Sequence, residues 1–138
     1  MRVDTIEQGL RDFYQTDIYN EGYQLAFRLA KDNLTLGLSV IGDSCNSITE
    51  SRIAWQQIAT DLGIQFVNIE VICSDESEHQ VRVETRKTSI PNLTLPTWKQ
   101  VQEREYQVWE NEVLKVDTAD QTIQQSVSDL FQLLKQTY

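Results

Sequence analysis

The fold is decided by the run Gln65-Phe66-Val67-Asn68-Ile69-Glu70-Val71-Ile72, which ends at Cys73-Ser74-Asp75. The run is rich in β-branched residues, which favour an extended chain, and it is too short for a typical helix. Polar residues suited to a turn follow it directly. The pattern therefore predicts a core strand that ends in a loop.

Helical patterns lie on both sides of this strand. Before it, Ser47-Ile48-Thr49-Glu50 has the form of a capping box and predicts a helix that Gly63 ends. After it, Asp75 with Glu78 repeats the capping pattern and predicts a helix through about Arg86. The strand is therefore expected to lie between two helices.

The same alternation extends over the rest of the chain. After a short opening strand we expect helices at 5–14, 19–36, 97–110 and from 122 onward, with further strands at 38–41 and 113–116. The helix at 97–110 begins with a third capping pattern, Thr97 with Gln100. Residues 88–96 hold both prolines and are expected to form a loop. Strands separated by helices imply right-handed crossovers. The predicted fold class is α/β, with a mostly parallel sheet covered by helices on both faces in three layers.

Composition limits the classes of function. A chain of 138 residues is expected to form a single domain, residues 1–138. The proline-containing loop after the helix that ends near Arg86 is where a lid would be built, and the lid region is expected at about 76–110. The net charge of −9 disfavours general binding to nucleic acid or to an anionic membrane. Two cysteines and one histidine do not match a recognised zinc spacing. No signal peptide or long apolar run is present, so we expect a cytoplasmic protein.

Polar residues gather where the predicted strands end. In parallel α/β sheets, ligands bind beyond the carboxyl ends of the strands. The residues at those positions are Asp4, Asp43 to Asn46, Cys73 to Asp75, and Asp117 to Ala119. Carboxylates there suit magnesium binding and the activation of a hydroxyl. For Asp75 the preferred interpretation is structural, because its capping partner Glu78 is present.

Two arginines lie on one face of the helix that follows Asp75. Arg82 and Arg86 are four residues apart, and Glu78 lies one turn earlier on the same face. One interpretation is a solvated ladder of Glu and Arg side chains. The other is a pair of lid arginines that neutralise a transferring phosphoryl group, because a proline-containing loop follows the helix.

A succession of motifs resembles P-loop kinases over nearly the whole chain. The closest group is that of small bacterial ATP-binding proteins described as predicted kinases or AAA-family ATPases, akin to the 5′-kinase domain of polynucleotide kinase and to zeta toxins. Each motif alone has low specificity, but their order and spacing are fairly specific. The motifs are Arg2-Val-Asp-Thr-Ile-Glu-Gln8, Val40-Ile-Gly-Asp-Ser-Cys-Asn46 with Arg52, Arg82-Val-Glu-Thr-Arg86, Leu95-Pro-Thr-Trp98 and Arg104-Glu-Tyr106.

The resemblance implies a role for individual residues. Asp4 matches the general base that acts on the acceptor hydroxyl, and Arg82 and Arg86 match lid arginines that clamp phosphates. The resemblance therefore implies a catalytic role for these three residues. The resemblance further implies ATP and Mg²⁺ as cofactors. The binding positions that it implies are Asp43 for magnesium and acceptor, Asn46 and Arg52 for the acceptor, and Asp117, Thr118 and Ala119 for the adenine.

The sequence departs from the resemblance at two places. Polynucleotide kinases carry an Arg three residues after the base, where this chain has Glu7, so we expect a small hydroxylated acceptor rather than a nucleic acid. No G-x-x-x-x-G-K-[ST] motif occurs either, although such a loop supplies the backbone N–H groups and the Lys that hold phosphates. By the size of one βα repeat, the corresponding strand, loop and helix would take about 30 residues before Arg2.

The strand that belongs to the phosphate loop is the central one in the related kinases, between the strands matching 38–41 and 66–72. Without this central strand, the strands at 38–41 and 66–72 are expected to pair directly with each other or to pair with a strand from another chain. An open gap is disfavoured because unpaired buried backbone groups cost about 1–3 kcal/mol each.

Three hypotheses for the function follow. The first is an ATP-dependent small-molecule kinase whose natural protein carries the phosphate loop upstream. The second is a non-catalytic remnant that binds a ligand or partner through the same cleft, and the third is a homo-oligomer that completes the sheet.

Overall fold

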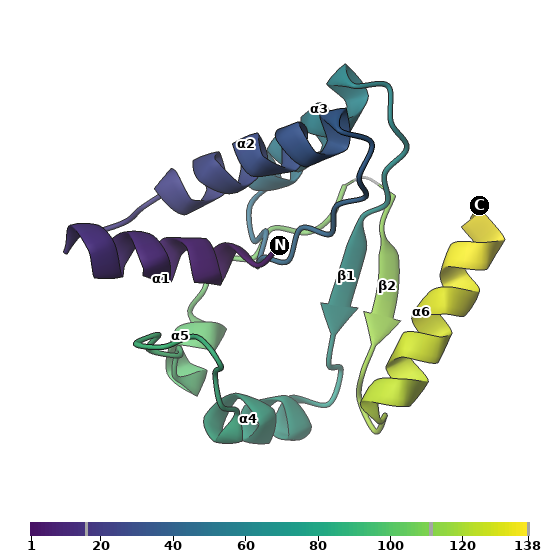
Figure 1. Cartoon of the computed structure of the whole chain (residues 1–138). Helices are drawn as coiled ribbons and strands as arrows, with labels where there is room; N and C mark the ends of the chain where they lie inside the picture. Colours follow the sequence, from purple (N-terminus) through teal and green to yellow (C-terminus); the bar gives the residue numbers. More distant parts are fainter. Residues whose placement is uncertain (16, 111, 138) are drawn as a thin grey trace. The chain divides into compact units, whose positions relative to one another are not determined.

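The computed structural model describes residues 1–15, 17–110 and 112–137, and it shows a mixed helix and strand architecture with a small parallel sheet (Figure 1). In chain order the elements are α1 (Val3–Tyr14), α2 (Glu21–Thr35), α3 (Thr49–Asp61), β1 (Ile69–Ile72), α4 (Glu76–Thr85), α5 (Trp98–Gln102), β2 (Leu114–Asp117) and α6 (Ile123–Thr137).

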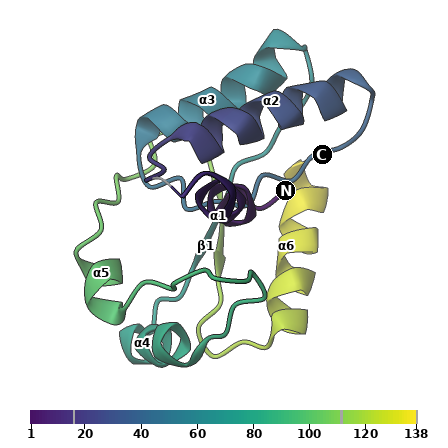
Figure 2. The same cartoon turned by 60° about the vertical axis from the view of Figure 1, so that its left-hand side comes forward.

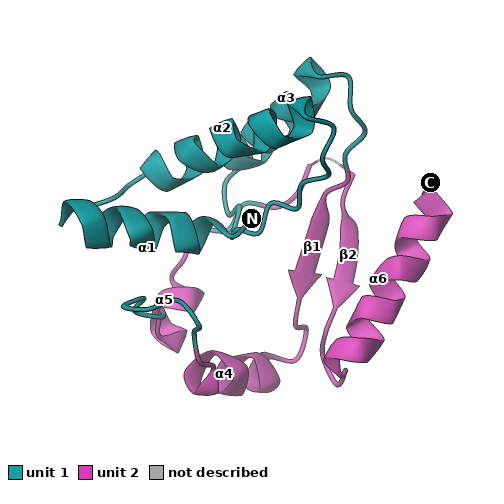
Figure 3. Cartoon of the chain, in the orientation of Figure 1, with its two compact units in different colours: residues 1–66, 88–95, 105–107 teal, residues 67–87, 96–104, 108–138 magenta. Residues whose placement is uncertain are grey.

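The chain divides into two compact units (Figure 3). Unit 1 comprises residues 1–66, 88–95 and 105–107, and unit 2 comprises 67–87, 96–104 and 108–138. The lid region expected at 76–110 is thus shared between the two units. That the chain is one domain stays a prediction.

Unit 1 is built from three helices and one short parallel pairing. The N–H of Val3 donates to Asp43 O at 2.9 Å and the N–H of Asp43 donates to Met1 O at 2.8 Å, which forms a parallel bridge between Arg2 and Asp43. Helix α2 contacts both α1 and α3, and Figure 2 shows α2 and α3 running side by side. Small side chains permit this packing, since Ala26, Ala30 and Ala59 are all buried.

Unit 2 contains the sheet. Strands β1 and β2 are parallel, with Ile69 opposite Leu114 and Ile72 opposite Asp117. On this ladder the buried Glu70 carboxylate meets Lys115 Nζ of the facing strand at 3.0 Å. Helix α6 contacts β2, and α4 contacts α5. A sheet of two strands depends on the elements packed on it for stability.

Two predicted caps are confirmed by the side-chain contacts. The Asp75 carboxylate accepts a hydrogen bond from the Glu78 N–H at 2.8 Å at the start of α4. At the start of α5, Thr97 and Gln100 form a reciprocal capping box. Both sequences therefore satisfy the free N–H groups of a first helical turn in the predicted way.

The capping box predicted at Ser47 does not form. The first residue of α3 is Thr49, and its cap residue Ile48 makes no side-chain capping bond. Instead Gln107, from a distant part of unit 1, accepts from the Thr49 N–H at 2.7 Å through its side-chain oxygen and donates its own N–H to Ser47 O at 2.8 Å. A tertiary contact thus takes the place of the local cap.

Two predicted elements are shorter than the sequence indicates. Residues 38–41 are not a strand, because the pairing on this segment is limited to the bridge at Asp43 and the bond from the Met1 amino group to Ile41 O at 2.7 Å. The helix predicted over 97–110 ends at Gln102. Its expected second half includes Gln107, whose backbone is held by Ser47 and Arg52 and is therefore not helical.

Candidate functional site

The loops at the carboxyl ends of β1 and β2 are joined by hydrogen bonds. The Asp117 carboxylate accepts from the N–H of Ser74 and from the N–H of Ala119, both at 3.0 Å. Thr118 donates its N–H to Ile72 O at 2.9 Å and its hydroxyl to the same oxygen at 2.7 Å. The two loops that follow the parallel strands therefore form one ordered edge, at the position where α/β proteins bind ligands.

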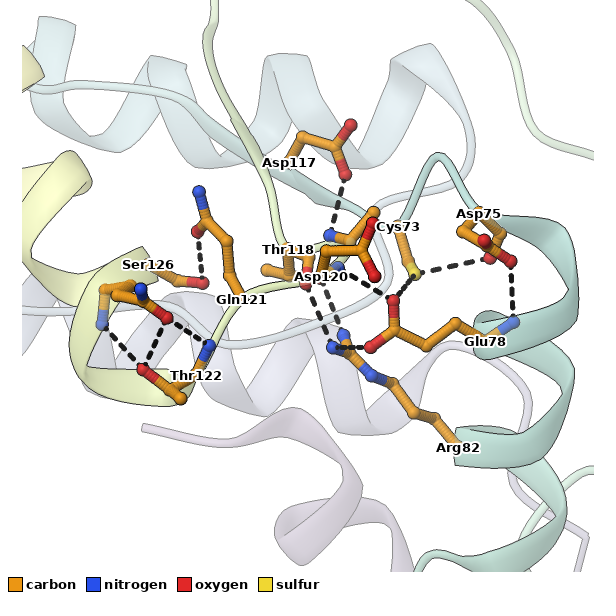
Figure 4. A network of polar contacts seen from close by, with 12 residues as sticks. Cys73, Asp75, Glu78, Arg82, Asp117, Thr118, Asp120, Gln121, Thr122 and Ser126 are labelled. Carbon is orange, nitrogen blue, oxygen red and sulfur yellow. Dashed lines mark hydrogen bonds and ion pairs between the residues drawn. The ribbon is translucent and has the colours of Figure 1, made fainter.

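Helix α4 adds a guanidinium to this edge. Arg82 Nη1 donates to Thr118 Oγ1 and Arg82 Nη2 donates to Thr118 O, each at 2.9 Å. Arg82 also forms an ion pair with Glu78, whose second carboxylate oxygen accepts from the Asp120 N–H at 2.9 Å (Figure 4). The predicted lid residue Arg82 and the predicted adenine-side residue Thr118 thus meet within unit 2.

Hydrogen bonds hold two carboxylates of this edge in the ionised form. Bonds from Ser74 and from the Ala119 N–H lower the pKa of Asp117 below its ordinary value. Bonds from the Ser77 hydroxyl and the Glu78 N–H lower the pKa of Asp75 in the same way. Asp75 is used as a helix cap, whereas the exposed Asp117 carboxylate remains open to solvent.

A cavity of about 370 Å³ lies between β2 and α6, next to Asp117. Val116 and Leu133 give it apolar surface, while the other lining residues are polar: Lys115, Asp117, Gln121, Asp129, Gln132 and Gln136. The amides of Gln132 and Gln136 can both donate and accept hydrogen bonds, whereas the Gln121 amide already donates to Asp129 and accepts from Ser126. This chemistry suits the edge of a nucleobase or a ribose.

The second lid arginine lies apart from this network. Arg86 is the C-cap of α4, its side chain is exposed, and its N–H donates to Arg82 O at 3.0 Å. Only Arg82 of the predicted pair makes side-chain bonds to the strand-end loops.

Unit 1 brings together the candidates on the acceptor side. Asp4 is exposed in the first turn of α1, directly after Val3, whose N–H is bonded to the backbone of Asp43. Asn46 has a left-handed φ of 43°, and its side-chain oxygen accepts from the Ser44 hydroxyl at 2.9 Å. The Asn46 N–H approaches the Tyr23 hydroxyl at 3.4 Å. The bridge therefore places the predicted base and the predicted acceptor edge on neighbouring segments.

Arg52 occupies a structural position. Its side chain is 4% exposed, and it donates to Asn46 O at 2.8 Å, Gln107 O at 2.7 Å and Ser47 O at 3.5 Å. The guanidinium also lies 5.2 Å from the ring centre of Tyr106. These contacts hold the loop after Asp43, so the predicted role of Arg52 as a substrate ligand stays a prediction.

The carboxylates do not form a metal centre by themselves. Across 1–15, 17–110 and 112–137 no group of three or more His, Cys, Asp or Glu residues is arranged to hold a metal ion. Magnesium in nucleotide sites is usually bound by one or two carboxylates together with phosphates. The single predicted ligand Asp43 would therefore need phosphate oxygens beside it to hold magnesium.

Sequence reasoning missed several residues that the structure places in these networks. Gln107 and Tyr23 belong to no motif, because their roles depend on tertiary contacts across unit 1. Gln121, Gln132 and Gln136 of the cavity were also missed, although Gln132 and Gln136 are four residues apart on α6 and this helical spacing offers a signal.

Comparisons of this chain with family models, with curated proteins and with solved structures found no match. Among the helices that the structure describes, none is at once long and apolar enough to cross a membrane. The function therefore has to be inferred from the residues and contacts above.

Proposed function

We propose that the chain is the body of an ATP-dependent phosphotransferase of the P-loop kinase type, with its nucleotide side in unit 2. The observation that carries this proposal is the pair of hydrogen bonds from Arg82 to Thr118 at the carboxyl ends of two adjacent parallel strands. A predicted phosphate-clamping arginine and a predicted adenine-side residue meet there.

One parallel pairing further supports the proposal. The bridge between Arg2 and Asp43 brings the segment of the predicted base Asp4 beside the predicted acceptor edge. The direct pairing expected between 38–41 and 66–72 does not form among the described residues, where β1 pairs with β2. The alternative, a strand from another chain beside this sheet, stays a prediction.

The residues fit the base and ribose of a nucleotide better than its phosphates. The cavity beside Asp117 offers amide groups and apolar walls, whereas no glycine-rich loop with a Lys occurs in the 138 residues. We infer that these residues supply the nucleoside contacts and that a separate glycine-rich segment must supply the phosphate cradle. The 138-residue chain alone is expected to bind adenosine and to transfer no phosphate.

Adenosine titration followed by NMR tests this function. Loss of one hydrogen bond in Gln132→Ala is expected to weaken adenosine binding about fivefold, by the roughly 1 kcal/mol that one such bond contributes. Gln124→Ala on the same helix serves as the control, because Gln124 is exposed and does not line the cavity. Equal affinities for the two variants, or phosphate transfer by the chain alone, would contradict the assignment.

A second candidate function, self-association through the sheet, is favoured by the edge of β1. Within the part of the chain that the structure describes, β2 is the only strand neighbour of β1, and Val71 is 65% exposed. Open strand edges of this kind pair with other chains. Sedimentation of the chain beside Val71→Lys distinguishes the outcomes. A dimer that the substitution dissociates supports the candidate, whereas a monomer at all concentrations excludes it.

A further inference from the structure

A second cavity, of about 330 Å³, lies in unit 1 between α2 and α3. Its lining comes from residues 19–27 at the start of α2 and residues 47–54 around the start of α3. The volume is at the lower end of the range for small-molecule sites in proteins. All of its described lining residues belong to unit 1, so it is distinct from the cavity beside Asp117 in unit 2.

Aromatic rings form one wall of the cavity. Tyr19, Tyr23 and Phe27 line it, together with Ile48 and Ala54. Phe27 meets Trp55 edge to face at a centroid distance of 4.8 Å, and Tyr23 lies 6.0 Å from Phe27 at a tilted angle. These ring contacts limit the rotation of Tyr23 and Phe27. The wall is therefore preformed and presents ring surface to a ligand.

The remaining lining is polar and almost uncharged. Asn20, Gln24 and Ser47 offer amide and hydroxyl groups, each able to donate and to accept. The Ser51 hydroxyl already donates to Ile48 O at 2.9 Å, so it offers a ligand its acceptor positions. The Tyr23 hydroxyl is protonated at neutral pH, and burial raises its pKa further. Among the described residues that line the cavity, Glu50 is the only charged one, and none is Lys, Arg or His. A ligand with several hydroxyl groups would find partners along this surface.

The charge of the lining disfavours the binding of anionic ligands. A phosphorylated or carboxylated molecule would lose its hydration beside Glu50 with no lining cation to replace it. The net charge of −9 adds a repulsive background. A neutral ring compound instead can stack its apolar face on the aromatic wall and bond its hydroxyls to the polar side chains.

We propose that this cavity binds a neutral, polyhydroxylated ring, either a sugar or a nucleoside. If the chain is the body of a kinase, as proposed, this neutral ligand is the acceptor of the phosphate, and that role rests on the proposed function. The link is Tyr23, which lines the cavity while its hydroxyl approaches the N–H of Asn46, a residue of the predicted acceptor edge. Binding itself follows from the cavity alone.

Ligand-observed NMR on the 138-residue chain tests the proposal with matched pairs of probes. The sugar arm uses ribose and ribose 5-phosphate, and the nucleoside arm uses uridine and uridine monophosphate. We expect binding of the neutral member of at least one pair, with its phosphorylated partner at least about tenfold weaker because of Glu50. Equal or tighter binding of both phosphorylated probes, or binding of none of the probes at about 10 mM, would overturn the proposal.

Variants assign any binding to the cavity. Ala54→Phe fills the space and is expected to abolish binding, and Gln24→Leu is expected to weaken it about fivefold by removing polar contacts without adding volume. Glu50→Gln should strengthen binding of the phosphorylated probes, while the control Glu110→Gln, outside the lining, should not. Unchanged affinities in both Ala54→Phe and Gln24→Leu would exclude this location.

The two proposals can fail separately. Binding of ribose or uridine without any binding of adenosine near Gln132 would retain the cavity assignment and remove the kinase interpretation. The reverse outcome is adenosine binding that Gln132→Ala weakens, together with neutral-probe binding that Ala54→Phe leaves unchanged. That outcome would retain the kinase interpretation and remove the cavity assignment.

Discussion

At the scale of single residues, position in the structure decides between roles that the residue type leaves open. Arg52 and Arg82 are both arginines of the kinase-like motifs. Arg52 is buried and donates to backbone carbonyls of unit 1, whereas Arg82 remains partly exposed beside the loops at the strand ends. The sequence could identify both as candidates. It could not distinguish them, because the carbonyls around Arg52 come from distant residues such as Gln107.

Replacement of Arg52 is expected to destabilise the protein. Arg52→Met leaves the carbonyls of Asn46 and Gln107 without their donor, at a cost of about 1.5–3 kcal/mol for charge-assisted bonds. Urea unfolding measures this cost. Arg28→Met on the exposed side of α2 is the control and should stay within about 0.5 kcal/mol. A variant of Arg52 as stable as the control would show that the buried contacts contribute little.

The lowered pKa of Asp117 predicts a dependence of stability on pH. Because the folded-state pKa lies below the ordinary value of 3.8, the contribution of Asp117 is fully present above about pH 3.8 and is lost as pH falls through the folded-state pKa. Asp117→Asn should therefore flatten the stability profile of unit 2 in that acidic range. Thermal unfolding between pH 2 and pH 6 tests this, with Asp61→Asn of α3 as the charge-matched control. Identical slopes for both variants would contradict the prediction.

At the scale of elements, local signals located helices more reliably than they located strands. The caps at Asp75 and Thr97 formed as predicted because both partners lie within one turn. The strand predicted at 38–41 did not form, since a strand requires a neighbour along its length and this segment has only the pairing with residues 1–3. The core strand was predicted, although it begins at Ile69 rather than at Gln65.

The contact between α1 and α2 gives a test at this scale. A Cβ added at the buried Gly22 would overlap the Glu7 side chain, whereas one added at Gly9 meets nothing within 4 Å. Gly22→Ala should therefore destabilise the protein by about 1–3 kcal/mol through overpacking. Gly9→Ala should stabilise it by up to about 1 kcal/mol through helix propensity. Chemical denaturation measures the free energy of unfolding of both variants. A Gly22→Ala variant more stable than the original protein would mean that α1 and α2 are not packed at this point.

The start of α6 gives a second test. Thr122 accepts from the Gln125 N–H at 3.3 Å, and Gln125 in turn accepts from the Thr122 N–H at 2.8 Å. Thr122→Ala is expected to cost about 1 kcal/mol. Ser128→Ala, at an exposed position on the same helix, should have little effect. Hydrogen exchange of the first turn of α6 should accelerate only in the Thr122 variant.

At the scale of the whole molecule, the sequence predicted parallel pairing but neither the segments that pair nor the extent of the sheet. Direct pairing was expected between 38–41 and 66–72, whereas in the described residues Arg2 bridges Asp43 and β1 pairs with β2. The wide three-layer sheet remains a proposal, because a two-stranded sheet is what the described residues form. Sheet width depends on long-range pairing that local patterns do not encode. The candidate site was predicted in part for the same reason: Arg82 and Thr118 were expected, and the glutamines of α6 were not.

Calorimetric titration of the 138-residue chain with adenosine and, separately, with Mg-ATP tests the central claim most directly. If these residues hold the nucleoside and a separate segment cradles the phosphates, both ligands bind with a Kd of about 1 mM, within a few-fold of each other. Mg-ATP binding about a hundredfold tighter than adenosine would reveal a phosphate cradle within this chain. No binding of either ligand at about 10 mM would contradict the nucleotide site itself.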